Sequence, residues 1–476
     1  IATRNLPADA VDRVQVYDKQ SDAAEFTGVA DGNEERTINI ALKPERRVGG
    51  FGKVSGAVGG SSEQGGMGDE MRYDADASIN RFWGSTRLSI LAGANNVNGA
   101  AYGPSQFPEL AALARQGAVF IGGSPDFGGG ASDGFTSSAS GGINLSRESG
   151  NTEFDGSYYA SYKDSERDRR TLQQRIVGEG QSADLDIQSD QSSDAYAHTL
   201  NLDVEHEFSD GHDVRFRSEG YYGSSDGRIS DARLTDSPSE DTRNVRNALT
   251  TSDGDEWRGE GSLTYRRRFA GDRSIVATLR GNRTDAGSLE NVDSDDRFFS
   301  RDTLLTVTEI ARLEDEATVS TGASARLLAT QPLPGVGRAL QLDGSFSRNS
   351  NDRDRRVEDI VGGTTALNAR LSSDFEQTID KATGGITYRD NGEGRREDRS
   401  FNLGVDVQTT WLRGETVGIG GPVDRRFLQV LPSFRYDQPL GTGRRMSFRY
   451  NTSTQEPSVR QLQRVPDDRD PLNVYV

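Results

Sequence analysis

The stretch that decides the fold is LNLDVEHEFSDGHDVRFR, residues 200–217. Before the Asp210-Gly211-His212 turn, apolar residues occupy alternate positions at Leu200, Leu202, Val204 and Phe208. After the turn they resume at Val214 and Phe216. Alternation with a period of two predicts a β-strand with two unlike faces, and a short turn with a central glycine is a common hairpin connection. The segment therefore predicts a β-hairpin.

A turn centred on Gly211 also predicts the register of this hairpin. It pairs Phe208 with Val214 on the apolar face, and on the polar face it pairs Glu207 with Arg215 and Glu205 with Arg217. Apolar residues then meet apolar residues and acids meet bases, as cross-strand pairs favour. A slip of one residue would exchange the two faces, so the pattern specifies which residues point the same way.

The same alternation of apolar and polar residues, interrupted by turns, recurs along the chain and predicts about fifteen strands. Short turns between alternating segments lie at Gly84-Ser85, Glu148-Ser149-Gly150, Gly271-Asp272, Pro334-Gly335 and Gly441-Thr442-Gly443. A further long strand carries Phe401, Leu403, Val405 and Val407. Long polar segments alternate with the short turns, at 96–138, 163–194, 223–255, 283–315 and 348–377.

Composition narrows the class of protein. The 476 residues carry a net charge of -18, no cysteine and 33% hydrophobic residues, with a mean hydropathy of -0.71. No run of eighteen apolar residues exists, which excludes transmembrane helices, but barrel strands need an apolar residue only at every second position. The acidic balance argues against a nucleic-acid partner, and the lack of cysteine excludes disulfides and thiolate metal sites.

These features together predict an all-β fold, a large antiparallel transmembrane β-barrel. Such barrels alternate short turns on one side of the membrane with long loops on the other. Aromatic pairs near strand ends, Phe82-Trp83, Tyr158-Tyr159 and Tyr221-Tyr222, are typical of interfacial girdles. Single-chain bacterial barrels close with an even strand number, so about fifteen strands predict a partial barrel that ends before closure.

The first 45 residues have a different texture. Pro7-Ala8-Asp9-Ala10-Val11 predicts a short helix, and alternation in Val14–Tyr17 and Thr37–Leu42 predicts two short strands. We expect residues 1–45 to form a small α/β plug remnant and residues 46–476 to form the barrel. A helix signal has no place in a barrel wall.

Both ends of the chain resemble a known family. Asn5–Asp18 is similar to the late plug domain of TonB-dependent receptors, and Thr37–Pro44 resembles the last plug strand before the barrel. Asp18–Gly28, Leu431–Tyr436, Asn451–Ser458 and Gln461–Gln463 are similar to the Bacteroidetes-type outer-membrane barrel subfamily. The resemblance implies a late plug domain followed by the first part of a barrel of about twenty-two strands.

The resemblance also implies a function and partners. The protein would be a TonB-dependent receptor in the bacterial outer membrane that takes up an iron chelate, a cobalamin or a glycan. Outer-membrane lipid would surround it, and TonB would contact a segment outside this chain. Loops and the plug apex would bind the ligand, with lumen-facing acids and arginines along its route. Three alternatives stand beside it: a non-transporting barrel with a binding or structural role, an outer-membrane hydrolase, and a soluble salt-adapted β protein.

No residue is assigned a catalytic, cofactor or metal role, so no enzyme is expected, and the ligand-binding residues stay unknown. Gly130–Gly134 matches the nucleophile-elbow pattern, but lacks the strand before it and the helix after it. His206 is expected to face outward and His212 to lie in a turn, pointing apart from it; with His198 they are the only histidines. Three acidic or mixed-charge runs are interpreted as solvated loops: Asp184–Asp194, Asp293–Asp296 and Asp352–Arg356.

Overall fold

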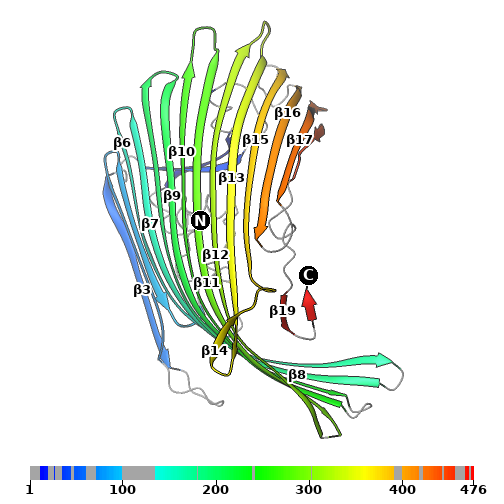
Figure 1. Ribbon diagram of the computed structural model, residues 1–476. Helices are drawn as coiled ribbons and strands as arrows, with labels where there is room; N and C mark the ends of the chain where they lie inside the picture. Colours follow the sequence, from blue (N-terminus) through cyan, green and yellow to red (C-terminus); the bar gives the residue numbers. More distant parts are fainter. Residues whose placement is uncertain are drawn as a thin grey trace.

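The computed structural model describes residues 11–19, 26, 35–43, 48–60, 71–98, 134–178, 181–237, 242–301, 303–390, 399–417, 422–441, 444–455, 467–470 and 473–475. Within them the fold is all-β, dominated by one antiparallel sheet of sixteen strands (Figure 1). Its strands are β3 (Gly49–Gly60), β4 (Met71–Trp83), β5 (Thr86–Asn95), β6 (Phe135–Ser149), β7 (Thr152–Gly178), β8 (Gln181–Ser209), β9 (His212–Ser237), β10 (Thr242–Arg268), β11 (Ser274–Ser300), β12 (Thr303–Pro332), β13 (Arg338–Val361), β14 (Thr364–Leu367), β15 (Ser373–Asp390), β16 (Ser400–Val417), β17 (Val423–Pro439) and β18 (Arg445–Asn451).

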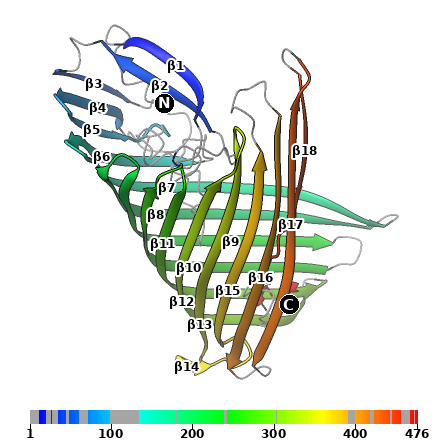
Figure 2. The same cartoon turned by 90° about the horizontal axis from the view of Figure 1, so that it is seen from above.

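The strands follow one another across the sheet in chain order. Every strand pairs with its sequence neighbours from β3 to β18, except that β14 pairs only with the end of β13. Fifteen strands therefore lie along the path, which confirms the expected count. Figure 2 shows the sheet curved around an open interior; β3 and β18 are not paired with each other in the described part of the chain. The sheet resembles the wall of an outer-membrane barrel that is not closed.

Within the described ranges, no helix has the length and the apolar character that crossing a bilayer requires.

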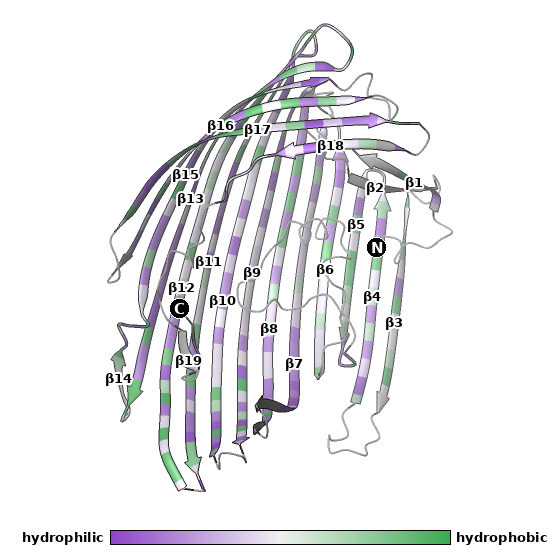
Figure 3. Cartoon of the chain, turned by 90° about the vertical axis from the view of Figure 1, so that its right-hand side faces the viewer, coloured by the Kyte–Doolittle hydropathy of each residue, from purple (hydrophilic) through white to green (hydrophobic). Residues whose placement is uncertain are grey.

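The two faces of the sheet differ in chemistry, as the alternation predicts. One face, here called the outer face, exposes large apolar side chains from almost every strand, among them Leu200, Phe216, Leu263, Leu342 and Val407. The opposite, inner face buries mainly polar residues, including Ser157, Thr199, Asp213, Gln341 and Thr410. Figure 3 shows the resulting alternation of hydrophilic and hydrophobic residues along each strand. A wall that is apolar outside and polar inside is what a lipid-embedded barrel requires.

The outer apolar residues form a belt of limited height. On β8 this apolar belt runs from Tyr196 to Phe208 and continues across the sheet on the neighbouring strands. At about 3.3 Å per residue and a tilt of about 45°, it rises roughly 28 Å, close to the apolar band of about 25 Å in such barrels. The height of the belt therefore suits a bilayer.

Aromatic rings mark both edges of the belt. Near one edge the rings of Tyr158 and His198 stack at 6.0 Å, and those of Tyr196 and Tyr222 lie 6.2 Å apart. Of each aromatic pair expected in a girdle, one member is exposed on the outer face: Trp83, Tyr158 and Tyr222. The other members point inward, because neighbouring residues of a strand face opposite ways; Tyr159, for example, is only 2% exposed.

The register expected for the central hairpin is wrong by two residues. The turn contains only Asp210 and Gly211, a favoured two-residue pair, and Phe208 is the extra residue of a β-bulge. Glu205 therefore pairs with Arg215, not with Arg217, and Glu207 pairs with Asp213. A shift of two keeps every side chain on its predicted face, since the strand period is two.

The segments expected to be long loops are largely strands. Residues 163–194 lie within β7 and β8, 223–255 within β9 and β10, and 283–315 within β11 and β12, apart from the few connecting residues outside the described part. Residues 348–377 contain the end of β13, β14 and the start of β15. The wall thus continues well past the belt as paired strands, here called the extension, which bends away from the wall in Figure 1. Of the fifth segment, 96–138, residues 99–133 lie outside the described part.

The N-terminal segment forms a separate sheet. Strands β1 (Val11–Lys19) and β2 (Glu35–Leu42) pair with each other and with no strand of the wall, which confirms the two expected strands. Figure 2 places them beside the edge strand β3. Val11 opens β1 and is not helical, so the expected helix is wrong at that residue; residues 7–10 lie outside the described part. A third small sheet pairs β19 (Asp467–Asp470) with β20 (Asn473–Tyr475).

Candidate functional site: an arginine-lined pocket on the inner face

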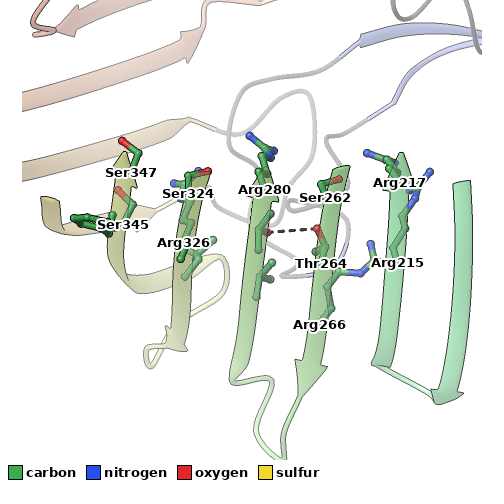
Figure 4. A pocket seen from close by; sticks show the side chains of 15 residues that line it. Arg215, Arg217, Ser262, Thr264, Arg266, Arg280, Ser324, Arg326, Ser345 and Ser347 are labelled. Carbon is green, nitrogen blue, oxygen red and sulfur yellow. Dashed lines mark hydrogen bonds between the residues drawn. The ribbon is translucent and has the colours of Figure 1, made fainter. Parts of the chain in front are cut away.

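The inner face carries a pocket of about 430 Å³ at the level of the apolar belt. Strands β9 to β13 supply its lining, and Figure 4 shows the arginine, serine and threonine side chains that these strands contribute. Five of the lining residues are arginines: Arg215, Arg217, Arg266, Arg280 and Arg326. Cross-strand register explains the gathering, because Arg217 lies opposite Ser262, Ser262 opposite Arg280, and Arg280 opposite Ser324.

Acidic residues balance most of these arginines. Arg215 binds Asp203 at 2.5 Å, and Arg217 binds the same carboxylate at 3.1 Å. Arg266 binds Asp213 at 2.5 Å and also pairs with Glu205. Because the acids lie on neighbouring strands, this network cross-links β8, β9 and β10 and fixes the direction of the guanidinium groups.

Arg326 binds Asp343 of β13 at 2.6 Å, yet its side chain stays 62% exposed. Arg280 is exposed and forms no ion pair within the described part of the chain. Hydroxyl groups lie between the bases: Thr264 and Thr278 are 3.4 Å apart, and Ser262, Ser324 and Ser345 complete the wall. The exposed guanidinium group of Arg280 and the neighbouring hydroxyl donors make this part of the pocket suited to an anionic or oxygen-rich group.

The N-terminal segment reaches the lower rim of the pocket. Phe26 is only 8% exposed, and the guanidinium groups of Arg266 and Arg268 lie 5.4 and 5.3 Å from its ring centre. The Arg268 side chain also donates a hydrogen bond to the Phe26 carbonyl. One residue of the segment before the barrel is therefore held on the inner face by cation–π contacts and a hydrogen bond.

The other residues singled out from the sequence are placed as follows. Gly130–Asp133 lie outside the described part, and Gly134 precedes β6. The interpretation of the three charged runs as loops is wrong, because the runs lie in strands β8, β11 and β13. In β13, for example, Arg353 binds Glu316 of β12 at 2.7 Å.

The histidines also differ from expectation. His212 is the first residue of β9, and both its ring and that of His206 contact Phe208, at centroid distances of 4.9 and 4.7 Å. The two rings therefore flank one aromatic side chain instead of pointing apart. His206 also lies 2.8 Å from the Thr152 hydroxyl. Among the described residues no three acidic, histidine or cysteine side chains converge as a metal site would need.

Sequence reasoning did not find this pocket. Its arginines come from three hairpins and lie far apart in the chain, so only the register between hairpins unites them. The one available signal was the run of basic residues on alternate positions, Arg215 with Arg217 and Arg266 with Arg268.

No family model and no curated protein matches the chain. Among solved structures it is similar to the alcaligin outer membrane receptor FauA from Bordetella pertussis, with 10% identity and a TM-score of 0.20 over 94% of this chain and 80% of that one. It is also similar to the ferric preacinetobactin receptor BauA from Acinetobacter baumannii, with 9% identity and a TM-score of 0.18 over 91% of this chain and 79% of that one. A third similar structure is the siderophore receptor PiuA from the same organism, with 9% identity and a TM-score of 0.17 over 91% of this chain and 80% of that one. All three of these neighbours are receptors.

Proposed function

We propose that the protein is a TonB-dependent receptor of the bacterial outer membrane, taking up a scarce nutrient of the iron chelate, cobalamin or glycan class. The observation that carries the proposal is the two-faced wall, with an apolar belt of bilayer height outside and charged groups inside. A wall of this kind encloses a polar route through a membrane. The exposed guanidinium groups of the inner pocket supply a place where a ligand's oxygen atoms bind.

Within this proposal residues 1–45 are the last part of a plug, and residues 46–476 are the first part of the barrel. Two observations support the division. Strands β1 and β2 pair outside the wall, and Phe26 contacts the inner face through Arg266 and Arg268. A plug must be held against the wall by contacts that can be released. The two cation–π contacts that tie Phe26 to the wall contribute about 2 kcal/mol each, the value for desolvated pairs.

Uptake by whole cells tests the function. Cells with and without the gene are supplied with a labelled ferric chelate, a cobalamin or an oligosaccharide, each in a strain with TonB and in one without it. We expect uptake of one class to need both the gene and TonB. If deleting the gene leaves all three uptakes unchanged, the alternative of a non-transporting barrel with a binding or structural role replaces this proposal.

A further inference from the structure

A cluster of basic residues lies on the outer face where the apolar belt ends on β13 to β17. Cross-strand register places Arg348 opposite Asp380, Asp380 opposite Trp411, and Trp411 opposite Arg426. Arg413 is the next outward residue on β16 after Trp411. These five residues, here called the arginine patch, come from four neighbouring strands and lie on the side of the belt away from the short turns.

Asp380 orients two of the arginines. Arg348 donates two hydrogen bonds to its carboxylate, at 2.7 and 3.0 Å, and Arg413 donates a third. The Asp380 side chain is only 8% exposed beneath them, whereas those of Arg348 and Arg413 are 57% and 52% exposed. Each guanidinium group has five N–H donors, so most donors of both arginines stay open to the surroundings while their positions are fixed.

The third arginine is held by an aromatic ring. The Arg426 guanidinium group lies 5.4 Å from the ring centre of Trp411. The patch therefore has three cations and one anion, with Asp424 opposite Arg413 one step further from the belt. Positive charge is not general along this rim: on β7 to β10 the register aligns Asp164, Asp194, Asp226 and Asp253 in one outward row.

We propose that the arginine patch binds the phosphate of an anionic lipid headgroup in the outer leaflet. The inference rests on the proposed function, which places the belt in a bilayer and the extension outside it. One step toward the middle of the belt, Phe346, Ala382, Thr409 and Leu428 form the adjoining outward row. A lipid whose phosphate contacts Arg348 and Arg413 thus has its acyl chains beside Phe346 and Leu428, which are 48% and 70% exposed. Guanidinium forks match phosphate oxygens in geometry and charge.

Tryptophan quenching tests this lipid directly. The chain has three tryptophans, so Trp83→Phe with Trp257→Phe leaves Trp411 as the sole reporter. The full chain is refolded into mixed vesicles of phosphatidylglycerol and phosphatidylcholine, in which one lipid or the other carries brominated chains. We expect phosphatidylglycerol to be enriched beside Trp411 by about fivefold over the bulk mixture, the effect of roughly one arginine-scale attraction at a lipid surface.

Two comparisons decide the outcome. Replacing Arg348, Arg413 and Arg426 by Gln should return the ratio to that of the bulk, whereas Arg283→Gln, on the outer face of β11, should leave it enriched. A second reporter, Trp257 alone, lies two outward positions along β10 from Asp253 of the acidic row and should show no enrichment. Equal quenching of Trp411 by both brominated lipids overturns the lipid site alone. No quenching by either lipid overturns the proposed membrane wall as well.

Discussion

The wall at the level of the apolar belt and the extension beyond it use the same backbone pairing but differ in what stabilises them. At the belt, the outer face exposes Leu200, Leu263 and Val407, which suits lipid. In the extension, charged residues occupy this face instead, as in the cross-strand pair of Arg170 with Asp186. The difference teaches that strand continuity in this sheet does not depend on alternating hydrophobicity.

A small core supports one part of the extension. Val357 and Leu371 are fully buried and Phe375 is 2% exposed, around the short strand β14. The Asn368 amide donates to the Val357 carbonyl at 2.8 Å, and the Ser372 hydroxyl accepts from the Val357 amide at 2.9 Å. The extension thus has local packing of its own, which the wall at the belt does not need.

The largest expected effect comes from a substitution that disrupts this core and leaves the belt unchanged. Leu371→Ala removes a fully buried side chain and should cost about 2–5 kcal/mol locally. Hydrogen exchange of the amides from 357 to 375 should accelerate, while exchange in the belt stays unchanged. Leu367→Ala is the matched control, because Leu367 is 59% exposed. Equal acceleration in both variants would show that no such core exists.

The next effect concerns the belt alone. Leu202 lies midway between Tyr196 and Phe208 on the outer side, so Leu202→Arg should cost about 2–4 kcal/mol of refolding free energy in lipid vesicles. Asn201→Arg faces the interior and should be mild. If the two substitutions behave alike, the assignment of faces is wrong.

A smaller effect distinguishes two constraints on glycine at the short turns: the left-handed backbone conformation and the space available for a Cβ atom. Gly211 has φ +68°, and a Cβ there would lie 2.9 Å from the Arg268 Cβ; Gly84 has φ +63° with open space around it. Gly84→Ala should cost about 1–2 kcal/mol for the left-handed conformation alone. Gly211→Ala should cost more, measured by urea unfolding in vesicles. Equal costs would show that the wall moves easily at Arg268.

The smallest effect lies in the outermost part of the extension. The hydrogen bond from Arg170 lowers the pKa of Asp186 below its usual value, with their closest atoms 2.7 Å apart. A lowered pKa in the folded state means that the pair stabilises the β7–β8 extension above about pH 4 and that this contribution is lost as the pH falls through the folded-state pKa. Amide exchange near residues 170 and 186 should rise on acidification. The same pH change should have little effect in Arg170→Gln, and an unchanged response there would contradict the role of the pair.

The contrast between the belt and the extension also explains which features the sequence could predict. Leu200, Leu202 and Val204 alternate with polar residues because only one face of the belt is apolar, so the strands at the belt, the short turns and the two faces were predictable. In the extension both faces are polar, so residues such as Asp184–Asp194 carry no such period and resemble a loop. The inner pocket was not predictable, because Arg217, Arg280 and Arg326 meet only through the registers of three hairpins.

The most direct test of the lipid-facing wall uses the absence of cysteine from the chain. Single cysteines are introduced one by one from 196 to 208 on β8, spin-labelled, and measured in vesicles for collision with oxygen, which concentrates in lipid, and with a water-soluble nickel chelate. We predict a period of two, with even positions accessible to oxygen and odd positions accessible to the chelate. Accessibility to the chelate at every position, without alternation, would contradict a membrane-spanning wall.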